Sequence, residues 1–412
     1  MKILWLCGNP GLFHAHGNRG GGWTGSLQME LLKKYPDIEL INVFSYSKPL
    51  DKERDGNVTY YPIYRNKIDK AVSFFDHYHK DKVFLNKAIK IIREEKPDII
   101  ECWGTELGYG LVAKETNIPV AIHIQGFVNP ILASYLPSGY SMTTLLRSMK
   151  YNFWDFFWKQ WRQYKLFALD AKREIEIMRN VKYLLGRTEW DKSVSKVLAP
   201  QAKYFYCSES LRPEFVSSRK WEYQNREKLI VTSVINNATY KGADVILKTA
   251  KLLKEMIGDD FRWEIYGVEN IKIYERANNI KALDVNVRCM GRVTANIIVD
   301  KLLNCDVFCH ESYIENSPNS VCEAQFLGVP VVAAMVGGVD TLMRDGAGIM
   351  VPANDAYRSA VAILNLKRDK ELAVNVSSKE IEISCKRHSG IAESLMNTYN
   401  QILIDSNHEY CL

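Results

Sequence analysis

The sequence predicts an α/β protein made of two doubly wound domains that face each other across a cleft, and three observations support this fold class. The chain has 412 residues, whereas a single hydrophobic core stops growing at about 250 to 300 residues. Short runs rich in valine and isoleucine alternate with segments of helical period, which is typical of parallel sheets covered by helices. A polar, charged stretch at 205–228 separates two such series.

The first predicted domain is a Rossmann-like unit at residues 1–210. Its strand candidates are KILWLC, IELINVF, PDIIECW and PVAIHIQG, which begin at Lys2, Ile38, Pro97 and Pro119. Helices are expected to open at Thr24 and to cover residues 87–94. The first run is too short for a secretory signal and has no cleavage site, so we interpret it as a core strand.

The second predicted domain is a Rossmann-like unit at residues 211–390. Its strand candidates are KLIVTSVI, FRWEIYGV, VRCMG, DVFCH, PVVAAM and GIMVPA, and each precedes a helical pattern. A last helical pattern at 391–412 follows after the strands have ended, and we expect it to pack back onto the first domain. Ligands of open α/β sheets bind at the carboxyl ends of the strands, so function is expected in the cleft.

Composition excludes an integral membrane protein and indicates a cytoplasmic one. The chain is 47% hydrophobic and 25% charged, and no apolar run approaches the roughly 20 residues needed to cross a bilayer. Its nine cysteines are scattered without metal-ligand spacing, which predicts reduced thiols. The net charge of +6 suits nucleotide phosphates or a lipid surface, and no nucleic-acid partner is expected.

The stretch ENSPNSVCE, from Glu315 to Glu323, predicts an anion site. Ser317 is expected to cap a helix whose first residue is Pro318. The backbone amides that follow, from Asn319 to Val321, would be unpaired donors at the positive helix end, where a diphosphate binds well. The two carboxylates can then grip hydroxyl groups on either side of the phosphates, although Glu323 alone could be an ordinary solvated helix residue.

Two glycine clusters suggest close backbone approach to a ligand. Gly337 and Gly338 follow the strand VPVVAAM, and we expect their amides to approach the ligand and Asp340 to cap the next helix. Gly20–Gly22 form a second glycine-rich loop, which is suited to binding phosphate. This loop is not G-x-G-x-x-G, and no acidic residue stands where a nicotinamide ribose would need one, which argues against a dehydrogenase.

The run from Val287 to Asp355 resembles the carboxyl-terminal half of the retaining glycosyltransferase family 4, which has GT-B architecture. The resemblance rests on the E-x7-E spacing of Glu315 and Glu323, followed by a G-x-P-V-V strand and a Gly-Gly turn. It implies that Glu315 contacts the donor sugar and Glu323 the ribose. The amides of Asn319 and Ser320 would lie near the diphosphate.

Lys241 and Gly242 resemble the K-G step of the family, in which the lysine binds donor phosphate. The family's arginine six residues earlier is replaced by Ile235, so Arg187 or Arg292 would have to supply that charge. By resemblance, the glycine loop with Gly21 and Gly22 lies across the cleft from the diphosphate. Base recognition is expected at two strand ends, Gly267-Val268 and Arg292-Val293.

Three residues of the first domain are candidates for contacts with the donor sugar or the acceptor. The family's histidine pair corresponds to Gln125-Gly126, and Gln125 is expected to contact the donor sugar. His123 lies two residues earlier on the same strand face, and it is either a second sugar contact or a core residue. Glu106, at the end of the neighbouring strand, is expected to orient the acceptor, although a helix cap would fit as well.

Residues 145–167 combine aromatic and basic side chains, among them Trp154, Trp158 and Trp161. This mixture suits a helix in a membrane interface beside a polyprenyl-linked acceptor. Aromatic residues at helical spacing also form ordinary cores, so both interpretations stay open.

These features together predict a retaining enzyme that moves a hexosyl group from a uridine or guanosine diphosphate sugar to a glycan or lipid-linked acceptor, in cell-surface polysaccharide synthesis at the inner membrane face. No D-x-D pair ends a strand, so neither a metal nor another cofactor is expected; a lysine and helix dipoles would replace the metal. Two alternatives remain: a catalytically silent nucleotide-sugar or glycan-binding module, and a nucleotide-sugar epimerase, which would need no acceptor.

Overall fold

The structure is a computed structural model that describes residues 1–8, 10–14 and 22–409. The chain divides into two compact units. The first comprises Met1–Asn129, Leu166–Ser210 and His388–Leu412, and the second comprises Pro130–Lys165 and Leu211–Arg387. Each unit is built around its own largely parallel sheet, which confirms the predicted fold class. Residues 130–165 thus group with the second unit, and the last helix groups with the first.

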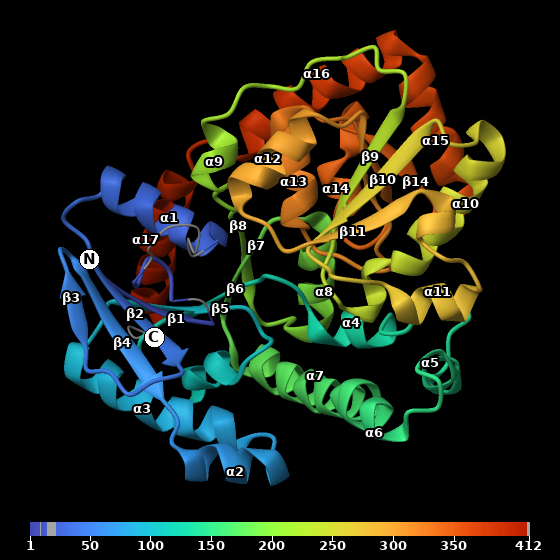
Figure 1. Cartoon of the computed structure of the whole chain (residues 1–412). Coiled ribbons are helices and arrows are strands. Elements are labelled where there is room, and N and C mark those ends of the chain that lie inside the picture. Colours follow the sequence, from blue (N-terminus) through green and yellow to red (C-terminus); the bar gives the residue numbers. More distant parts are fainter. Residues whose placement is uncertain (9, 15–21, 410–412) are drawn as a thin grey trace. The chain divides into compact units, whose positions relative to one another are not determined.

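The first unit contains an eight-stranded sheet in the order β3-β4-β2-β1-β5-β6-β7-β8 (Figure 1). All neighbouring strands are parallel except the pair β3 and β4. The strands are β1 (Lys2–Cys7), β2 (Glu39–Tyr46), β3 (Glu53–Asp55), β4 (Val58–Tyr64), β5 (Ile99–Trp103), β6 (Val120–His123), β7 (Tyr183–Gly186) and β8 (Lys203–Tyr206). Strands β1, β2, β5 and β6 agree with the predicted runs. The other four were missed. The edge strands β3 and β8 have no buried residue, β4 contains Pro62, which is unusual inside a strand, and β7 follows directly on a long helical segment that ends at Asn180.

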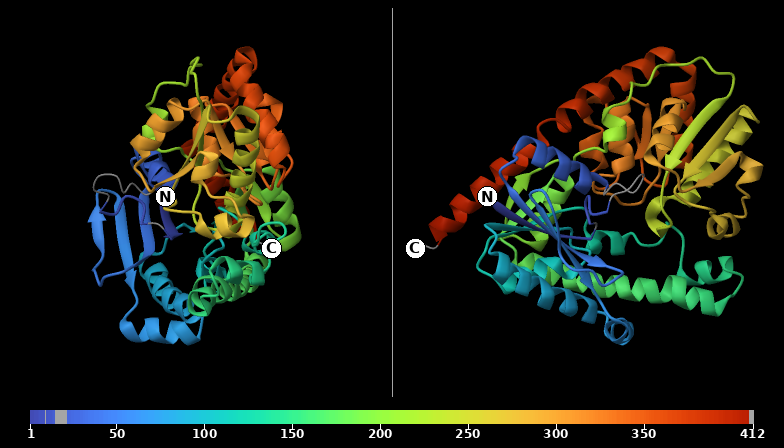
Figure 2. Two further views of the ribbon diagram at one scale, coloured as in Figure 1. Left: turned by 45° about the vertical axis from the view of Figure 1, so that its right-hand side comes forward. Right: turned by 60° about the vertical axis from the view of Figure 1, so that its left-hand side comes forward.

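Helices cover both faces of this sheet, as the two further views in Figure 2 also show. One face packs against α1 (Gly22–Lys34) and α17 (Ile391–Glu409). The other packs against α3 (His79–Glu95), the 3₁₀ helix η1 (Gly108–Lys114) and α7 (Arg162–Asn180). Alternation along β1 explains the two layers, because Ile3 and Trp5 join the first cluster while Leu4 and Leu6 join the second.

The second unit contains a six-stranded, fully parallel sheet in the order β11-β10-β9-β12-β13-β14. Its strands are β9 (Leu229–Val234), β10 (Phe261–Tyr266), β11 (Val287–Gly291), β12 (Val307–His310), β13 (Val331–Ala334) and β14 (Ile349–Val351). All six lie in predicted runs. The central strands β12 and β13 are buried at every residue, whereas β10 and β11 carry the exposed Arg262 and Arg288. The chain reverses its winding direction between β9 and β12, which are neighbours at the centre of the sheet.

The remaining helices connect these strands. In the second unit they are α5 (Met142–Ser148), α6 (Phe153–Phe156), η2 (Phe157–Trp161), α9 (Pro213–Val216), η3 (Thr239–Lys241), α10 (Ala243–Ile257), α11 (Lys272–Asn278), η4 (Leu283–Val285), α12 (Ala295–Leu303), α13 (Asn319–Leu327), α14 (Val339–Leu342), η5 (Arg344–Gly346), α15 (Ala356–Arg368) and α16 (Lys370–Arg387). The first unit also has α2 (Lys67–Phe75) and α8 (Glu189–Leu198), and α4 (Val128–Ala133) starts there. None of the helices in the described residues is long and apolar enough to span a membrane.

Candidate active site

Two loops meet at the carboxyl edge of the second sheet, where the winding direction reverses. The loop after β9 carries Lys241, and the loop after β12 carries Glu315. Open α/β sheets bind ligands at such a reversal, because the two neighbouring loops diverge and leave a crevice. The parallel pairing of β9 with β12 therefore brings the lysine and the glutamate together.

Glu315 is held by three polar side chains. Its Oε1 atom lies 2.5 Å from Lys241 Nζ, accepts a hydrogen bond of 2.8 Å from Ser312 Oγ, and lies 3.2 Å from His310 Nε2. Burial works to raise the pKa of this carboxyl, but Lys241 and His310 outweigh it and lower the pKa to about 2. Glu315 is therefore ionised at physiological pH. Its Oε2 atom accepts no hydrogen bond from any described residue.

Two glycines make this arrangement possible by allowing tight backbone approach. Gly242 has a φ of 72°, and a Cβ atom there would lie 1.7 Å from the Glu311 carbonyl oxygen. Gly337 has a φ of 51°, and its Cβ would lie 1.9 Å from the Glu315 carbonyl oxygen. No residue with a side chain fits either place without moving one of the two loops.

The double glycine has a different role from the expected one. The Gly338 N–H donates to the Glu315 carbonyl oxygen at 3.0 Å, so this amide holds the glutamate loop and is not available to a ligand. Asp340 does not cap a helix, because Gly338 is the N-cap of α14 and Asp340 lies inside the helix. Its carboxylate accepts a hydrogen bond from Arg344 instead.

Helix α13 begins one residue later than predicted. Pro318 is its N-cap, with an extended backbone, and Asn319 is the first helical residue. The Val321 N–H already donates to the Pro318 carbonyl oxygen, so it is no longer an unpaired donor. The amides of Asn319 and Ser320 have no acceptor in the described part of the chain, which leaves two of the three expected donors for an anion.

Glu323 lies in the second turn of α13 and is paired with a residue that sequence reasoning did not single out. Arg212 donates from Nε to Glu323 Oε1 at 2.7 Å and from Nη2 to Oε2 at 2.8 Å. The only local signal at Arg212 is the following proline, which marks a helix start. Nothing in that pattern points to a partner 111 residues away.

The strand ends expected to read the base are tightly packed. Ile235, which stands where the family has an arginine, is buried. A Cβ atom on Gly267 would lie 2.1 Å from the Ile235 carbonyl oxygen, so the two backbone segments are in close contact. The Gly267 N–H donates to the Gly291 carbonyl oxygen. Val268 is buried and Val293 half-buried, whereas Arg292 is exposed and forms no ion pair with any described residue.

His123 belongs to a buried network in the first unit. Its Nδ1 lies 2.6 Å from Glu101 Oε1, and the other carboxylate oxygen of Glu101 accepts a hydrogen bond from the hydroxyl of Tyr399 on α17. Trp103 stacks on the imidazole with ring centroids 4.9 Å apart, and Trp23 contacts it edge-on. His123 is thus fully enclosed among the described residues of this unit.

Gln125 and Glu106 converge on Gly104 at the carboxyl ends of β5 and β6. A Cβ on Gly104 would lie 2.0 Å from Glu106 Oε2 and 3.6 Å from Gln125 Cγ. Glu106 is exposed and Gln125 half-buried, so both are more accessible than His123.

The remaining candidates of the first unit are Arg187 and the glycines of the loop before α1. Arg187 is buried and pairs with Glu209, with Nε 2.9 Å from the carboxylate, and its guanidinium lies over the Trp23 ring. Gly22 opens α1 with a φ of 59°, and Gly21 lies outside the described residues.

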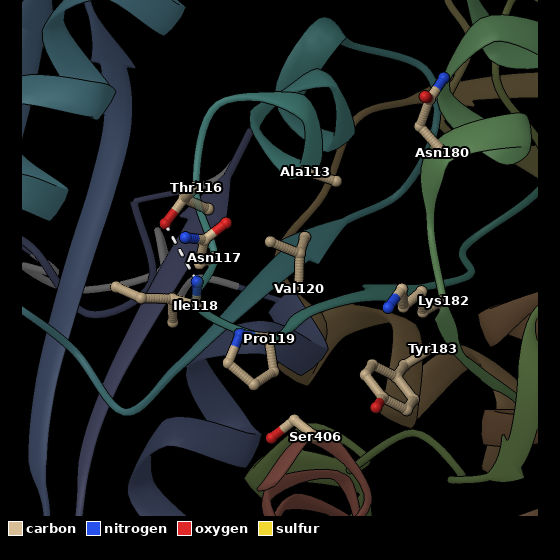
Figure 3. Close-up of a pocket in the computed structure, with 10 residues that line it drawn as sticks. All are labelled: Ala113, Thr116, Asn117, Ile118, Pro119, Val120, Asn180, Lys182, Tyr183 and Ser406. Carbon is tan, nitrogen blue, oxygen red and sulfur yellow. Dashed lines mark hydrogen bonds between the residues drawn. The ribbon is translucent and has the colours of Figure 1, made fainter. Parts of the chain in front are cut away.

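A cavity of about 380 Å³ lies at the opposite end of the first sheet, where β6 and β7 begin (Figure 3). It is lined by the loop before β6, by Asn180, Lys182 and Tyr183, and by Ser406 of α17. None of the predicted site residues lines it, and ligands of open α/β sheets bind at the other strand ends. It is therefore not part of the candidate active site.

Residues 217–382 match the family model described as glycosyl transferases group 1. The match lies within the second unit and includes Lys241, Glu315 and Glu323. A comparison with curated protein sequences finds no match.

Solved structures with a similar fold cover nearly the whole chain. Sucrose-phosphate synthase from Thermosynechococcus elongatus is 14% identical, with a TM-score of 0.70 over 98% of this chain and 99% of that one. HepE from Anabaena, in complex with UDP and glucose, is 15% identical, with a TM-score of 0.63 over 97% and 99%. The trehalose-6-phosphate structure from E. coli, bound with UDP-2-fluoro glucose, is 10% identical, with a TM-score of 0.67 over 98% and 99%. The TM-scores over nearly the whole chain establish the fold, and together with the family match they support a glycosyltransferase of GT-B architecture.

Proposed function

We propose that this chain is a retaining glycosyltransferase of family 4 that moves a hexosyl group from a nucleoside diphosphate sugar to a glycan or lipid-linked sugar, in the synthesis of a cell-surface polysaccharide. The observation that carries the proposal is the polar cluster around Glu315, at the carboxyl edge of β9 and β12, within residues matched to glycosyl transferases group 1. Uridine diphosphate is the favoured nucleotide, because HepE is in complex with UDP and glucose.

The cluster has the chemistry that the donor requires. An ionised Glu315 with an unused Oε2 atom can accept hydrogen bonds from sugar hydroxyls, and these are stronger than bonds to a neutral acceptor. The amides of Asn319 and Ser320, at the start of α13, have no acceptor among the described residues and suit phosphate oxygens. Lys241 adds a positive charge for the leaving diphosphate. Glu323 is assigned to the ribose by its place in the E-x7-E motif.

Nucleotide binding gives the first test. Thermal shift with UDP, GDP, ADP and CDP should show stabilisation by UDP or GDP alone. Hydrolysis of labelled UDP-hexoses and GDP-hexoses should then be lost in Glu315→Gln and retained in Glu371→Gln, a control on the exposed face of α16. Stabilisation by neither nucleotide would refute the donor class, and binding without turnover would favour a silent binding module.

The products test the reaction type. With an acceptor present, an unchanged anomeric configuration in the NMR spectrum of the product is expected of a retaining enzyme. An isomerised nucleotide sugar formed without acceptor would instead identify an epimerase.

We expect the reaction to need no divalent metal. Lys241 and the α13 amides carry the positive charge that a metal would otherwise supply to the leaving diphosphate. Turnover in excess EDTA should therefore equal turnover in Mg²⁺ or Mn²⁺ within about twofold. A loss that is restored by either metal would contradict this part of the proposal.

The acceptor is proposed to be membrane-linked, and residues 145–167 are proposed to contact the inner face of the membrane. This segment has five basic residues against one acid, and neither α6 nor η2 contains a buried residue. Phe153 and Trp154 are 66% and 72% exposed, and Lys165 lies over the exposed Trp161 ring. Exposed aromatic rings beside basic groups fit the interface of an anionic bilayer.

Vesicle binding tests this contact. The chain should sediment with phosphatidylglycerol vesicles and not with phosphatidylcholine vesicles, and Trp154→Ser should lower binding several-fold. Tyr357→Ser is the matched control, because Tyr357 is an equally exposed aromatic residue on α15. Equal effects of the two substitutions, or no binding by the wild type, would refute the membrane contact.

A further inference from the structure

Helix α2 of the first unit turns an apolar face away from the unit. Ile68, Ala71 and Phe75 lie on one side of this helix, because they follow one another at steps of three and four residues. Ile68 is 73% and Phe75 88% exposed, and none of the residues of α2 is buried. A surface helix ordinarily packs such a stripe against the core, so the orientation of α2 is the reverse of the usual one.

The polar side of α2 faces the rest of the unit. Asp69 and Ser73, which lie away from the stripe, are half-buried. The Asp69 carboxylate lies 3.3 Å from Nε2 of His79, the first residue of α3, and Arg65 donates from Nη1 to Ser73 Oγ at 3.5 Å. These contacts set the rotation of the helix about its axis and keep the apolar stripe outward.

Local hydrogen bonds hold α2 in helical form. The Asp69 N–H donates to the Asn66 side chain at 2.8 Å, and the Asn66 N–H donates to the Asp69 carboxylate at 3.1 Å, which is a capping box. At the other end, the Asp76 N–H donates to the Val72 carbonyl oxygen at 2.8 Å. The apolar stripe is therefore preformed, and the helix lies at the edge of the first unit in each view (Figures 1 and 2).

Two lysines border the stripe. Lys67 and Lys70 lie on the same edge of α2, are exposed, and form no ion pair with any described residue. The single acid of the helix, Asp69, is turned towards α3, and Asp76, directly after the helix, lies 3.1 Å from Lys82 Nζ. The exposed face thus combines apolar side chains with uncompensated positive charge, which complements an anionic surface.

We propose that α2 is an interfacial anchor of the first unit: its stripe of Ile68, Ala71 and Phe75 inserts into the surface of an anionic bilayer, and the two bordering lysines contact lipid phosphates. An amphipathic helix of this kind lies in the plane of the interface, with its apolar face at the boundary of the lipid chains. The anchor is separate from the contact proposed for residues 145–167, which shares no residue with α2. The choice of a bilayer over a protein partner rests on the charge beside the stripe and on the membrane-linked acceptor of the proposed function.

Vesicle sedimentation of the full-length chain tests the apolar part of the anchor. Ile68→Ser should weaken binding to phosphatidylglycerol vesicles about five- to tenfold, because it removes apolar surface that the bilayer would bury. Val197→Ser is the matched control, since Val197 is an isolated, 78% exposed residue on α8 of the same unit, and it should bind within about twofold of the wild type. Both variants should keep the wild-type melting temperature, because neither side chain is part of a core.

The lysines are tested in the same assay. Lys67→Gln and Lys70→Gln should each weaken binding to phosphatidylglycerol vesicles about fivefold, as expected for one cation beside an anionic surface. Binding to phosphatidylcholine vesicles, which carry no net charge, should not change. Lys196→Gln, at an exposed lysine on α8 that forms no ion pair with a described residue, should leave binding unchanged.

Hydrogen exchange locates the contact on the chain. The amides of residues 67–75 should exchange more slowly when phosphatidylglycerol vesicles are added to the wild type. Residues 356–368 of α15 should exchange at the same rate with and without vesicles. Unchanged exchange at residues 67–75 on vesicle-bound protein would overturn the anchor.

The outcomes separate this inference from the proposed function. Weaker binding in Trp154→Ser together with wild-type binding in Ile68→Ser would overturn the anchor and leave the contact at residues 145–167 standing, and the reverse pattern would support the anchor and overturn that contact. A wild type that does not bind phosphatidylglycerol vesicles would overturn both, whereas the nucleotide donor is decided independently by thermal shift. A wild-type dimer that Phe75→Ser converts to a monomer in analytical ultracentrifugation would show that a second copy covers the stripe, and would overturn the bilayer as its partner.

Discussion

Lys241 Nζ lies 2.5 Å from Glu315 Oε1, although 74 residues separate the two along the chain. The contact exists because β9 and β12 are neighbours in the sheet, so the loops that follow them leave the same edge. The contact gives the nearly buried carboxylate of Glu315 a positively charged partner. An unpaired carboxylate at this position would destabilise the folded state.

Replacing the lysine should abolish most of the transfer activity. Lys241→Met removes the cation proposed for the leaving diphosphate and leaves Glu315 without its closest partner, so kcat should fall by about 10²- to 10³-fold. Steady-state kinetics measures this. Lys248→Met is the control, because Lys248 pairs with Asp244 on the same stretch of chain, and it should change kcat less than twofold. A Lys241→Met enzyme with a tenth of wild-type activity would contradict the role.

Glu311 should make stability depend on pH. Burial, with a smaller contribution from Asp244, raises the pKa of this carboxyl from 4.5 to about 7. The folded state therefore binds the proton more tightly than the unfolded state. The stability from this group is complete below about pH 4.5 and is lost as the pH rises through 7, by up to about 3 kcal/mol.

Glu311→Gln should remove that dependence. Urea unfolding at pH 8 should show a higher free energy of unfolding for the variant than for the wild type, and the difference should shrink as the pH is lowered to 5. The wild type is its own control across the pH series. A difference that stays constant with pH would show that Glu311 does not titrate in this range.

Gly337→Ala should damage the active site more than its backbone strain alone explains. Both Gly337 and Gly258 have a positive φ, 51° and 61°, but a Cβ on Gly258 would meet nothing within 4 Å. Gly258→Ala should therefore cost only its backbone strain, roughly 1 to 3 kcal/mol. Gly337→Ala adds a clash with the Glu315 carbonyl oxygen, so it should cost more and lower kcat as well. Similar melting temperatures and rates for the two variants would refute this reasoning.

Tyr399→Phe should destabilise the first unit. The Tyr399 hydroxyl donates to the fully buried Glu101 and accepts a hydrogen bond from Trp5 Nε1 at 3.0 Å. Losing the donor to a buried carboxylate should cost roughly 2 kcal/mol in the free energy of unfolding. Tyr357→Phe, at an exposed tyrosine, should change it by less than about 0.5 kcal/mol. Equal effects in chemical denaturation would show that Glu101 does not depend on Tyr399.

The strands of the second sheet were predictable because their signal is local. The central strand β13 is an apolar run that is buried at every residue, and the edge strand β11 was also predicted with its bounds, although Arg288 in it is exposed. In the first unit β8 was missed because this edge strand has no buried residue, and β7 was missed although its four residues are all buried. The E-x7-E spacing of Glu315 and Glu323 could also be predicted, and the start of α13 was predicted to within one residue, since both depend on residues that follow one another.

The sequence by itself thus determined the alternation of strands and helices, and with it the fold class and the edge of the sheet where chemistry is expected. Only the tertiary structure decided which side chains meet there: Arg212 with Glu323, Lys241 with Glu315, and Tyr399 with Glu101 across 298 residues. The physical reason is that periodicity belongs to neighbouring residues, whereas a long-range ion pair depends on which strands lie side by side.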